Sequence, residues 1–324
     1  MSLESVKKVY DSVMDSVGRV IVGKREVTEL AVITLLCGGH MLIDDVPGTG
    51  KTVLSKTFAR SLSLDYKRVQ CVPDMLPTDV VGVNFFDMKQ NEFRFVKGPV
   101  FTNILLADEI NRAMPKTQSG LLEAMEEHQV SMDGVTYILE EPFMVIATQN
   151  PVETKGTFDL PEAQLDRFLI KTSMGYPTHS ESVEILSRKL ANAIAPEADT
   201  DNSVDRETVL SARRELAEVY VHEDLLAYAA SICEATRRGN DVILGASPRA
   251  MIALVRVAQG FAAVAGRDYV LPDDIKRAAT PTLAHRIVFS NNFFHRSNLG
   301  EELIKGLLEK VSVPSEQINF ARKA

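Results

Sequence analysis

The sequence predicts an α/β fold in which a mostly parallel sheet with flanking helices is followed by an all-helical unit. Two patterns along the chain support this prediction. Up to about Pro177, short apolar runs alternate with helical patterns, as in strand–helix repeats. After Pro177 only helical periodicity remains. The apolar runs are HMLID (40–44), NILLAD (103–108), FMVIAT (143–148) and FLIKTSM (168–174).

Length and helix signals divide this fold into two domains. The 324 residues exceed the roughly 250–300 at which a single hydrophobic core stops growing. We therefore expect residues 1–177 to form an α/β core and residues 178–324 a helical domain. Thr178, followed three residues later by Glu181, has the spacing of a capping box and marks the first helix of the second domain.

The composition narrows the possible functions. No apolar run approaches the roughly 18 residues that a membrane span needs, and MSLESVKKVYDSV is too polar for a signal peptide. We therefore expect a cytoplasmic protein without membrane contact. Cys37, Cys71 and Cys233 show no C-x-x-C spacing, which predicts buried thiols and no zinc site or disulfide framework. The net charge of −8 argues against nonspecific nucleic-acid binding.

The segment IDDVPGTGKTVL (43–54) indicates a phosphate-binding loop. It keeps the end of the pattern G-x-x-x-x-G-K-[ST], with Asp45 in place of the first glycine. The preceding HMLID reads as a buried strand and the following KTVLSKTFARSL as a helix. The loop therefore lies where backbone N–H groups and a helix N-terminus can receive phosphate.

Each position of the loop has a physical task. Gly48 and Gly50 allow the backbone to wrap round an anion. Lys51 can reach the β and γ phosphates, and Thr52 can offer its hydroxyl to Mg²⁺. Asp45 is tolerated in the turn if its carboxylate points away from the phosphates, because aspartate accepts unusual backbone angles better than most residues.

Two carboxylates follow a predicted strand downstream of the loop. In NILLADEINRA, four apolar residues precede Asp108 and Glu109, which places both carboxylates at the exposed end of the strand beside the loop. Asp108 would hold the Mg²⁺ shell, and Glu109 would orient and deprotonate the attacking water. A solvated pair at the end of a strand is the alternative, and the upstream phosphate loop favours the catalytic interpretation.

Asn150, at the end of a later predicted strand, and Arg167, near the sheet edge in a polar segment, are further candidates. Asn150, in PFMVIATQNP, could hydrogen-bond the γ-phosphate or the water, or it could be a turn residue before Pro151. Arg167, in LPEAQLDRFLI, could stabilise charge on a transferring phosphoryl group. An arginine beside Asp166 is, taken alone, more often part of a salt bridge.

Arg249 is the candidate in the helical domain. In GASPRAMIAL, Ser247 suits an N-cap and Pro248 the first helical position, so Arg249 falls on the first turn. Its charge and the positive end of the helix favour an anion, and Arg249 could reach the nucleotide from the second domain. An exposed arginine in a capped helix is the alternative.

Together these motifs resemble an AAA+ ATPase of the MoxR type over nearly the entire chain. IVGK (21–24) resembles the family's box before the first strand, and DDVPGTGKT its acidic Walker A motif. VQCVPDMLPTDVVGVNFF, followed by FRFVKGPVFTNILLADEINRAMPKTQSGLLEAMEE, is the most specific portion. It resembles the family signature through Walker B and implies an inserted hairpin at about 83–97. EHQVSMDGVTYIL resembles the hairpin before sensor 1.

The resemblance implies a role for each candidate residue. Lys51 and Thr52 would belong to Walker A, Asp108 and Glu109 to Walker B and Asn150 to sensor 1; Arg167 would be a finger given to a neighbouring subunit and Arg249 sensor 2. The expected nucleotide contacts are Val22 and Gly23, flanking adenine, with Pro47, Gly48, Thr49, Gly50, Lys51, Thr52 and Val53. Thr52 and Asp108 would bind the metal, and Glu109, Asn150, Arg167 and Arg249 would serve catalysis.

The resemblance also implies an architecture and a task. We expect an AAA+ P-loop αβα core with an all-helical lid, binding Mg-ATP between the domains at the subunit boundaries of a ring, taken as a hexamer. The ring would remodel or mature a protein, often one with a von Willebrand factor A domain. One alternative is the ATPase subunit of a metal chelatase or a nucleic-acid motor, and the acidic charge disfavours the motor. The other is a nucleotide-gated scaffold with little turnover, which Asp108 and Glu109 disfavour.

Overall fold

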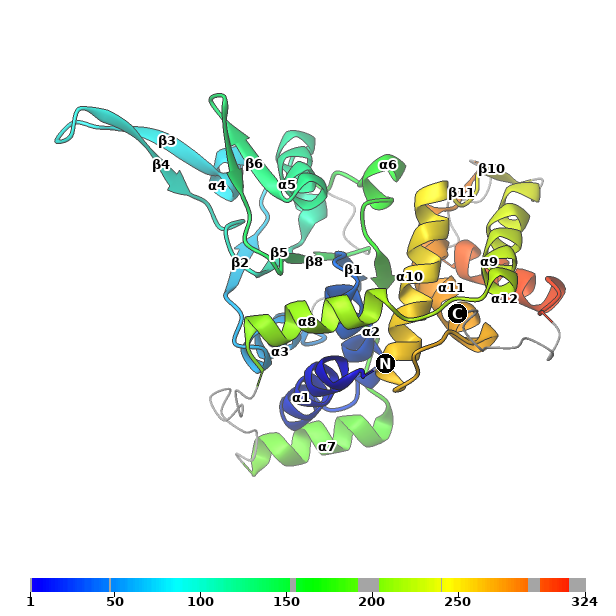
Figure 1. The fold of residues 1–324 in the computed structure, drawn as a ribbon. Helices are drawn as coiled ribbons and strands as arrows, with labels where there is room; N and C mark the ends of the chain where they lie inside the picture. Colours follow the sequence, from blue (N-terminus) through cyan, green and yellow to red (C-terminus); the bar gives the residue numbers. More distant parts are fainter. Residues whose placement is uncertain are drawn as a thin grey trace.

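The computed structural model describes residues 2–46, 48–151, 156–191, 204–239, 241–290 and 298–314. A parallel sheet with the strand order β2-β5-β8-β1-β9 forms its centre (Figure 1). The strands are β1 (Met41–Asp44), β2 (Tyr66–Gln70), β5 (Ile104–Asp108), β8 (Met144–Gln149) and β9 (Ile170–Thr172). The four predicted apolar runs are therefore confirmed as strands. β2 was not among them, because Val69 is its one buried residue and β2 lies at the edge of the sheet.

Helices cover both faces of the sheet and make it a three-layer αβα core. Successive residues of a strand point to opposite faces, so Met41 and Ile43 of β1 join one hydrophobic cluster and Leu42 joins the other. The first cluster includes α1 (Glu4–Val20), α2 (Arg25–Leu36) and α3 (Lys51–Ser61). The second includes α4 (Pro77–Val81) and α5 (Pro115–Glu127). Two short segments, η1 (Ile110–Arg112) and α6 (Glu162–Leu165), follow β5 and precede β9 respectively.

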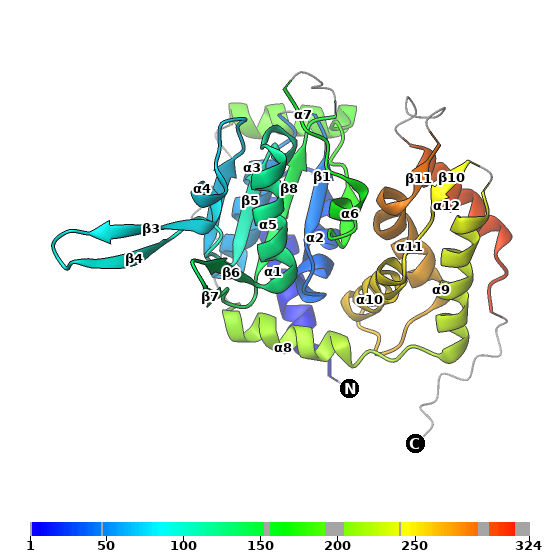
Figure 2. The same cartoon turned by 90° about the horizontal axis from the view of Figure 1, so that it is seen from above.

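Two β-hairpins extend from the second face of the core. β3 (Gly82–Asp87) pairs with β4 (Glu92–Lys97), and β6 (Gln129–Met132) pairs with β7 (Val135–Ile138). The expected inserted hairpin and the hairpin before sensor 1 are thus confirmed. Phe95 of the first hairpin stacks on Tyr137 of the second with ring centroids 4.1 Å apart. The β3–β4 hairpin projects well beyond the rest of the molecule (Figure 2).

The C-terminal part is helical, as predicted. It contains α7 (His179–Leu190), α8 (Arg206–Ala217), α9 (Glu223–Ala235), α10 (Pro248–Val264), α11 (Pro272–Leu283), α12 (Leu299–Lys310), η2 (Thr236–Arg238) and η3 (Ala284–Arg286). The predicted capping box of Thr178 and Glu181 begins α7. One short antiparallel pair, β10 (Val242–Leu244) with β11 (Val288–Phe289), is additional, because strands this short leave no periodicity in the sequence.

The helical part contacts the core at several points. α8 packs against α1 and α2 as well as α10, whereas α9 to α12 pack on one another (Figure 1). Gly260 of α10 lies so close to α2 that a Cβ at this position would stand 2.5 Å from Cγ2 of Ile33. Because α8 bridges the two parts, the division between residues 177 and 178 stays a prediction.

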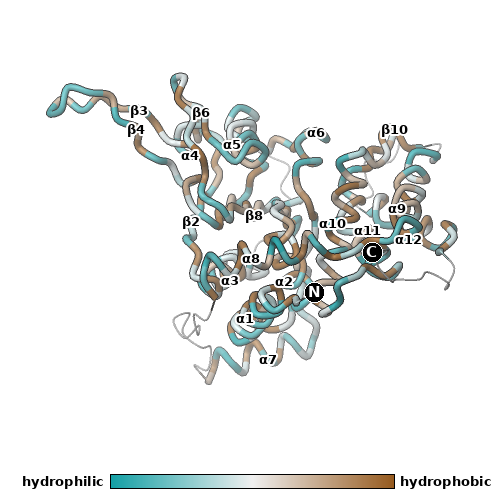
Figure 3. Tube along the Cα trace, in the orientation of Figure 1, coloured by the Kyte–Doolittle hydropathy of each residue, from teal (hydrophilic) through white to brown (hydrophobic). Residues whose placement is uncertain are grey.

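Apolar side chains concentrate inside these layers. Figure 3 shows hydrophobic residues along β8 and α10 and hydrophilic residues at the tip of the β3–β4 hairpin. Cys37, Cys71 and Cys233 are buried free thiols, as expected, and burial raises the pKa of Cys37 to about 12. None of the described helices combines the length and apolar character needed to cross a lipid bilayer.

Candidate functional site

The predicted phosphate loop connects β1 to α3 at the carboxyl edge of the sheet. Gly48 and Gly50 adopt φ angles of 83° and 94°, in the left-handed region that favours glycine. A Cβ added at Gly48 would meet nothing within 4 Å, so open space lies over the loop there. Pro47 lies outside the described residues. Because α3 begins at Lys51, its unpaired N-terminal N–H groups face the loop.

Asp45 anchors the start of the loop to the chain that follows β9. Its side chain is buried, and Oδ2 accepts hydrogen bonds from the backbone N–H groups of Met174 (3.0 Å) and Gly175 (2.9 Å). Oδ1 accepts one from the N–H of Val46 (2.7 Å). The carboxylate is therefore held by backbone N–H groups at the first turn and after β9. This explains how an aspartate replaces the usual glycine without placing a free negative charge in the phosphate cradle.

Lys51 lies across the loop. Its Nζ donates to the carbonyl oxygens of Asp45 (2.8 Å) and Val46 (3.2 Å), so the ammonium group is held over the loop backbone. The hydroxyl of Thr49 also donates to the carbonyl of Val46 (3.3 Å). Thr52 and Val53 occupy the first turn of α3 and are partly exposed.

Val22 and Gly23 lie beside the chain that follows β9, the segment to which Asp45 is also bound. Gly23 has a φ of 70°, and a Cβ there would stand 2.1 Å from Oε1 of Glu181 at the start of α7. Nζ of Lys24 donates to the carbonyl of Gly175 at 3.1 Å. Val22 is buried. Since Gly175 also donates to Asp45, the structure brings the Val22–Gly23 turn close to the start of the phosphate loop.

The two carboxylates lie at the end of β5, where residues of β2, β8 and η1 provide their hydrogen-bond partners; Nη1 of Arg112 donates to Oε2 of Glu109 (3.3 Å). Asp108 is buried; Oδ1 accepts from the hydroxyl of Thr148 (2.6 Å), and Oδ2 accepts from Nη2 (2.7 Å) and Nε (3.2 Å) of Arg68. Oε2 of Glu109 accepts from Nε2 of Gln70 (2.8 Å). The hydroxyl of Thr148 in turn accepts from the backbone N–H of Glu109 (2.9 Å).

Arg68 and Gln70 of β2 were not predicted from the sequence. They lie two residues apart and so point to one face of β2, and Gln70 pairs in register with Asp108. The spacing was visible in the sequence, but it gains meaning only once residues 66–70 are known to form a strand next to β5.

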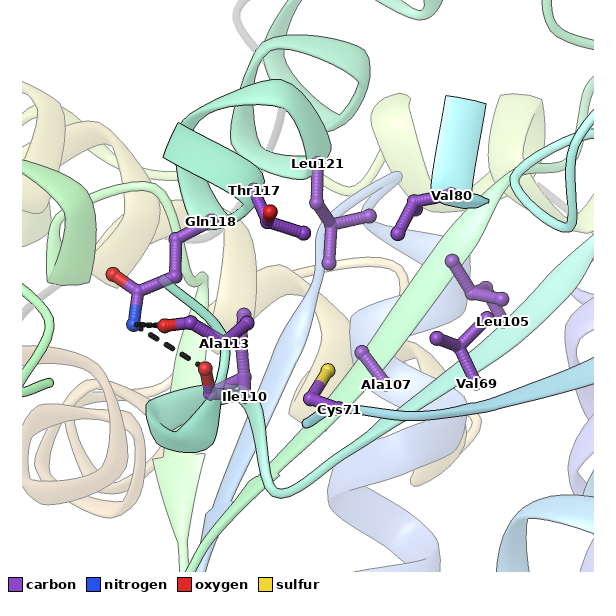
Figure 4. Close-up of a pocket in the computed structure, with 10 residues that line it drawn as sticks. All are labelled: Val69, Cys71, Val80, Leu105, Ala107, Ile110, Ala113, Thr117, Gln118 and Leu121. Carbon is purple, nitrogen blue, oxygen red and sulfur yellow. Dashed lines mark hydrogen bonds between the residues drawn. The ribbon is translucent and has the colours of Figure 1, made fainter. Parts of the chain in front are cut away.

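The buried side chain of Gln118 stabilises the turn that follows Glu109 through hydrogen bonds to its backbone. Nε2 of Gln118 donates to the carbonyls of Ile110 (3.3 Å) and Ala113 (3.1 Å), as Figure 4 shows. The same group donates to the carbonyl of Phe158 (2.9 Å). The neighbouring cavity, of about 10 Å³ and lined by residues such as Cys71 and Leu121, is too small for a ligand. Glu109, with a φ of 56°, is therefore followed by a rigidly held turn.

Asn150 lies beside the loop, at the same edge of the sheet. It is buried and directly follows β8, whose last residue, Gln149, pairs with Asp44 of β1. The carbonyl of Gln149 accepts from the backbone N–H of Asp45 (3.1 Å). The structure thus brings Asn150, the loop and the two carboxylates to one edge of the sheet.

Arg167 and Arg249 lie elsewhere, and both contact Glu126. Nε of Arg167 lies 2.9 Å from Oε2 of Glu126, and Nη2 of Arg249 bonds the other carboxylate oxygen. The Arg249 guanidinium holds the pKa of Glu126 below its usual range. The two arginines line a cavity of about 300 Å³ together with Arg256 and Arg286.

This cavity lies at the amino edge of the sheet. Arg167 precedes β9, whose first residue, Ile170, pairs with the first residue of β1, Met41. A strand rises roughly 3.3 Å per residue, so the four residues of β1 alone separate this edge from the phosphate loop by roughly 13 Å. The structure therefore does not bring Arg167 or Arg249 to the phosphate loop of the same chain.

The loop and the carboxylates fit a nucleoside triphosphate with a divalent cation. Gly48 leaves open space above a turn of backbone N–H groups, and Thr52 and Asp108 supply the oxygen donors that Mg²⁺ prefers. Within the described residues, no cluster of three or more His, Cys, Asp or Glu side chains could hold a metal without other ligands.

Comparisons with known proteins agree with this geometry. A family model described as "ATPase family associated with various cellular activities (AAA)" matches residues 40–170, and an AAA lid domain model matches residues 234–305. The chain is 43% identical to the uncharacterized protein YeaC of Bacillus subtilis over 97% of this chain and 98% of the relative. It is 40% identical to a Mycobacterium tuberculosis protein named Chaperone MoxR1 over 94% of this chain and 81% of the relative. A crystal structure of a candidate ATPase from Cytophaga hutchinsonii superposes with a TM-score of 0.85 at 37% identity and covers 96% of this chain and 98% of its own.

Replacing Asp45 with glycine tests the role of the loop's first turn. We expect Asp45→Gly to keep ATP affinity within a few-fold, because backbone N–H groups of the loop, and not this carboxylate, face the open space over Gly48. Its stability should fall by roughly 1.5–3 kcal/mol for each hydrogen bond lost to the charged group. Lys51→Ala should instead abolish binding. Isothermal titration with ATP and urea unfolding measure the two effects; a folded Asp45→Gly protein that binds no ATP would contradict this account.

Proposed function

The chain belongs to the MoxR family of AAA ATPases and is an ATP hydrolase, and from this premise we propose that it works as a ring in which each ATP lies between two subunits. One observation carries the proposal. The phosphate loop and the carboxylates lie at the carboxyl edge of the sheet, whereas Arg167 and Arg249 meet on Glu126 at the amino edge. A subunit can therefore offer these arginines only to a neighbour. A closed ring, taken as a hexamer, gives every subunit such a neighbour.

Each residue of the site has a task in this proposal. The phosphates bind to the backbone of Gly48, Thr49 and Gly50 and to Lys51. The adenine of the nucleotide lies next to Val22 and Gly23. Glu109 accepts the proton of the attacking water, and its backbone is fixed by the hydroxyl of Thr148. Asn150 donates from the neighbouring strand to the γ-phosphate or the water. Arg167 and Arg249 stabilise the charge of the transferring group from the adjacent subunit.

Thr52 and Asp108 are the residues that would hold Mg²⁺. When bound, the ion neutralises charge on the phosphate oxygens. The hydroxyl of Thr148 donates to Oδ1 of Asp108 and orients the carboxylate. The second oxygen, Oδ2, accepts a hydrogen bond from Arg68. Arg68 is 44% exposed in its side chain and also donates to Oε1 of Gln70 (2.6 Å), so its guanidinium keeps a partner and contact with solvent if the metal takes its place on Asp108.

A protein client fits the surface of the molecule better than a nucleic acid does. The projecting β3–β4 hairpin exposes large apolar side chains, among them Phe93 (74% exposed) and Met88 (87% exposed). The chain carries a net charge of −8, which opposes phosphate backbones. One relative is named a chaperone. We therefore favour remodelling or maturation of a cytoplasmic protein, such as one with a von Willebrand factor A domain.

Glu109→Gln tests the assignment of the base. We expect unchanged Mg-ATP affinity and a turnover at least ~10² lower, the smallest loss expected when a positioned general base is removed. Glu123→Gln, which changes an exposed glutamate of α5, is the matched control and should keep wild-type turnover. Steady-state hydrolysis and nucleotide titration give both values. Equal turnover in Glu109→Gln and wild type would reject Glu109 as the base.

Mixing two inactive variants tests the donation of Arg167 to a neighbour. Arg167→Ala should bind nucleotide yet lose roughly 10³ to 10⁵ in turnover, and Lys51→Ala should not bind. In a mixed ring, an intact site forms where an Arg167→Ala subunit faces an Arg167 from a Lys51→Ala neighbour, so partial activity should return.

The control mixture combines Lys51→Ala with Glu109→Gln, two changes to the same side of the site, and should stay inactive. Native mass measurements establish that mixed oligomers form. If mixed oligomers form and the Arg167→Ala mixture remains as inactive as its components, Arg167 is not donated to a neighbouring subunit.

A further inference from the structure

Arg286 of η3 bonds the chain on both sides of Arg167. Its side chain is 3% exposed, and Nε lies 3.0 Å from Oδ1 of Asp166. Nη2 donates to the carbonyl of Phe168 (2.7 Å) and to that of Asp166 (3.2 Å). One buried guanidinium from the helical part thus contacts the two residues that flank the proposed finger.

Two more residues of the helical part bind the same segment. Nε2 of His285 lies 3.1 Å from the carbonyl oxygen of Phe168. A carbonyl only accepts, so this nitrogen carries the hydrogen, and burial holds the pKa of His285 well below its usual range and keeps the ring neutral. The hydroxyl of Ser247, which caps α10, lies 3.4 Å from both carboxylate oxygens of Asp166.

The segment needs such contacts to hold its shape. Asp166 and Arg167 lie in a turn between α6 and β9, so no regular element fixes the backbone beneath the Arg167 side chain. A buried charge is costly unless a partner compensates it. Nη2 of Arg286 donates to two carbonyls of this segment, and Nε lies within ion-pair distance of Asp166, whereas Nε and Nη1 make no hydrogen bond within the described residues. Filling space would need only an apolar side chain, so the arrangement indicates control of position.

We propose that Arg286 is a positioning residue that sets the place of Arg167 and thereby links the orientation of the helical part to hydrolysis at the neighbouring subunit's site. The link to the neighbour rests on the proposed function, in which Arg167 is donated across the interface. Any rotation of η3 relative to the sheet moves the guanidinium of Arg286, and with it the backbone of residues 166–168. A displacement of about 1 Å at a catalytic group can cost roughly 10²-fold in rate.

The variant Arg286→Gln tests this inference. We expect its turnover to fall about tenfold or more, while ATP affinity at its own site stays within about twofold, because the phosphate loop lies at the other edge of the sheet. Mixed with Lys51→Ala, it should recover activity as Arg167→Ala does. The Lys51→Ala neighbour then donates a correctly placed Arg167 to the intact phosphate loop of the Arg286→Gln subunit. In the Arg167→Ala background, Arg286→Gln should add almost no further loss.

Arg267→Gln is the matched control. Arg267 forms an ion pair with Asp274 inside the helical part (2.7 Å), and neither residue bonds residues 166–168 in the described structure. It should keep turnover within about twofold. If Arg286→Gln does not fold, Asp166→Asn removes the same ion pair from the core side and should give the same pattern.

Wild-type turnover in a folded Arg286→Gln or Asp166→Asn protein would overturn the inference, as would a loss that adds fully to that of Arg167→Ala. The comparison with Arg167→Ala does not depend on which subunit receives the arginine. Failure of Arg167→Ala to recover with Lys51→Ala would therefore count against the ring proposal, whereas full additivity would count against the positioning role of Arg286.

Discussion

The parallel pairing of β1 with β8 and β9 decides which functional side chains can meet. All residues that follow these strands lie at the carboxyl edge, and all that precede them lie at the amino edge. Asp45 and Asn150 belong to the first group, and Arg167 belongs to the second. The sheet thus divides the proposed catalytic set in two, and in the proposed ring the two halves of one complete site come from different subunits.

Every buried charge around the candidate site has a partner before a ligand binds. Asp45 is bound by backbone N–H groups, Asp108 by Thr148 and Arg68, and Arg286 by the turn at Asp166. Such pairing is required because an unpaired charge in the interior costs several kcal/mol. These contacts also determine what has to change on binding. In the proposed function the Asp108 ion pair with the half-exposed Arg68 gives way to the metal, whereas the backbone contacts of Asp45 and the buried contacts of Arg286 are kept.

The features that could be predicted from the sequence are those determined by residues close together in the chain. Strand β1, the glycine turn and α3 follow from adjacent residues, as do the capping box of Thr178 and Glu181 and the Asp108–Glu109 pair at the end of an apolar run. Arg68 and Gln70 could not be found in this way, because the edge strand that carries them buries only Val69. The start of the helix at Arg249 was predicted correctly from Ser247 and Pro248. Its contact with Glu126, 123 residues away, depends on tertiary packing that no local pattern records.

In the proposed ring, no single subunit contains a complete hydrolytic site. Turnover per subunit, measured across a dilution series with the oligomer mass determined at each concentration, tests it most directly. The account predicts that turnover per subunit falls steeply as oligomers dissociate, while each monomer still binds ATP. Constant turnover per subunit in a solution shown to contain only monomers would contradict it.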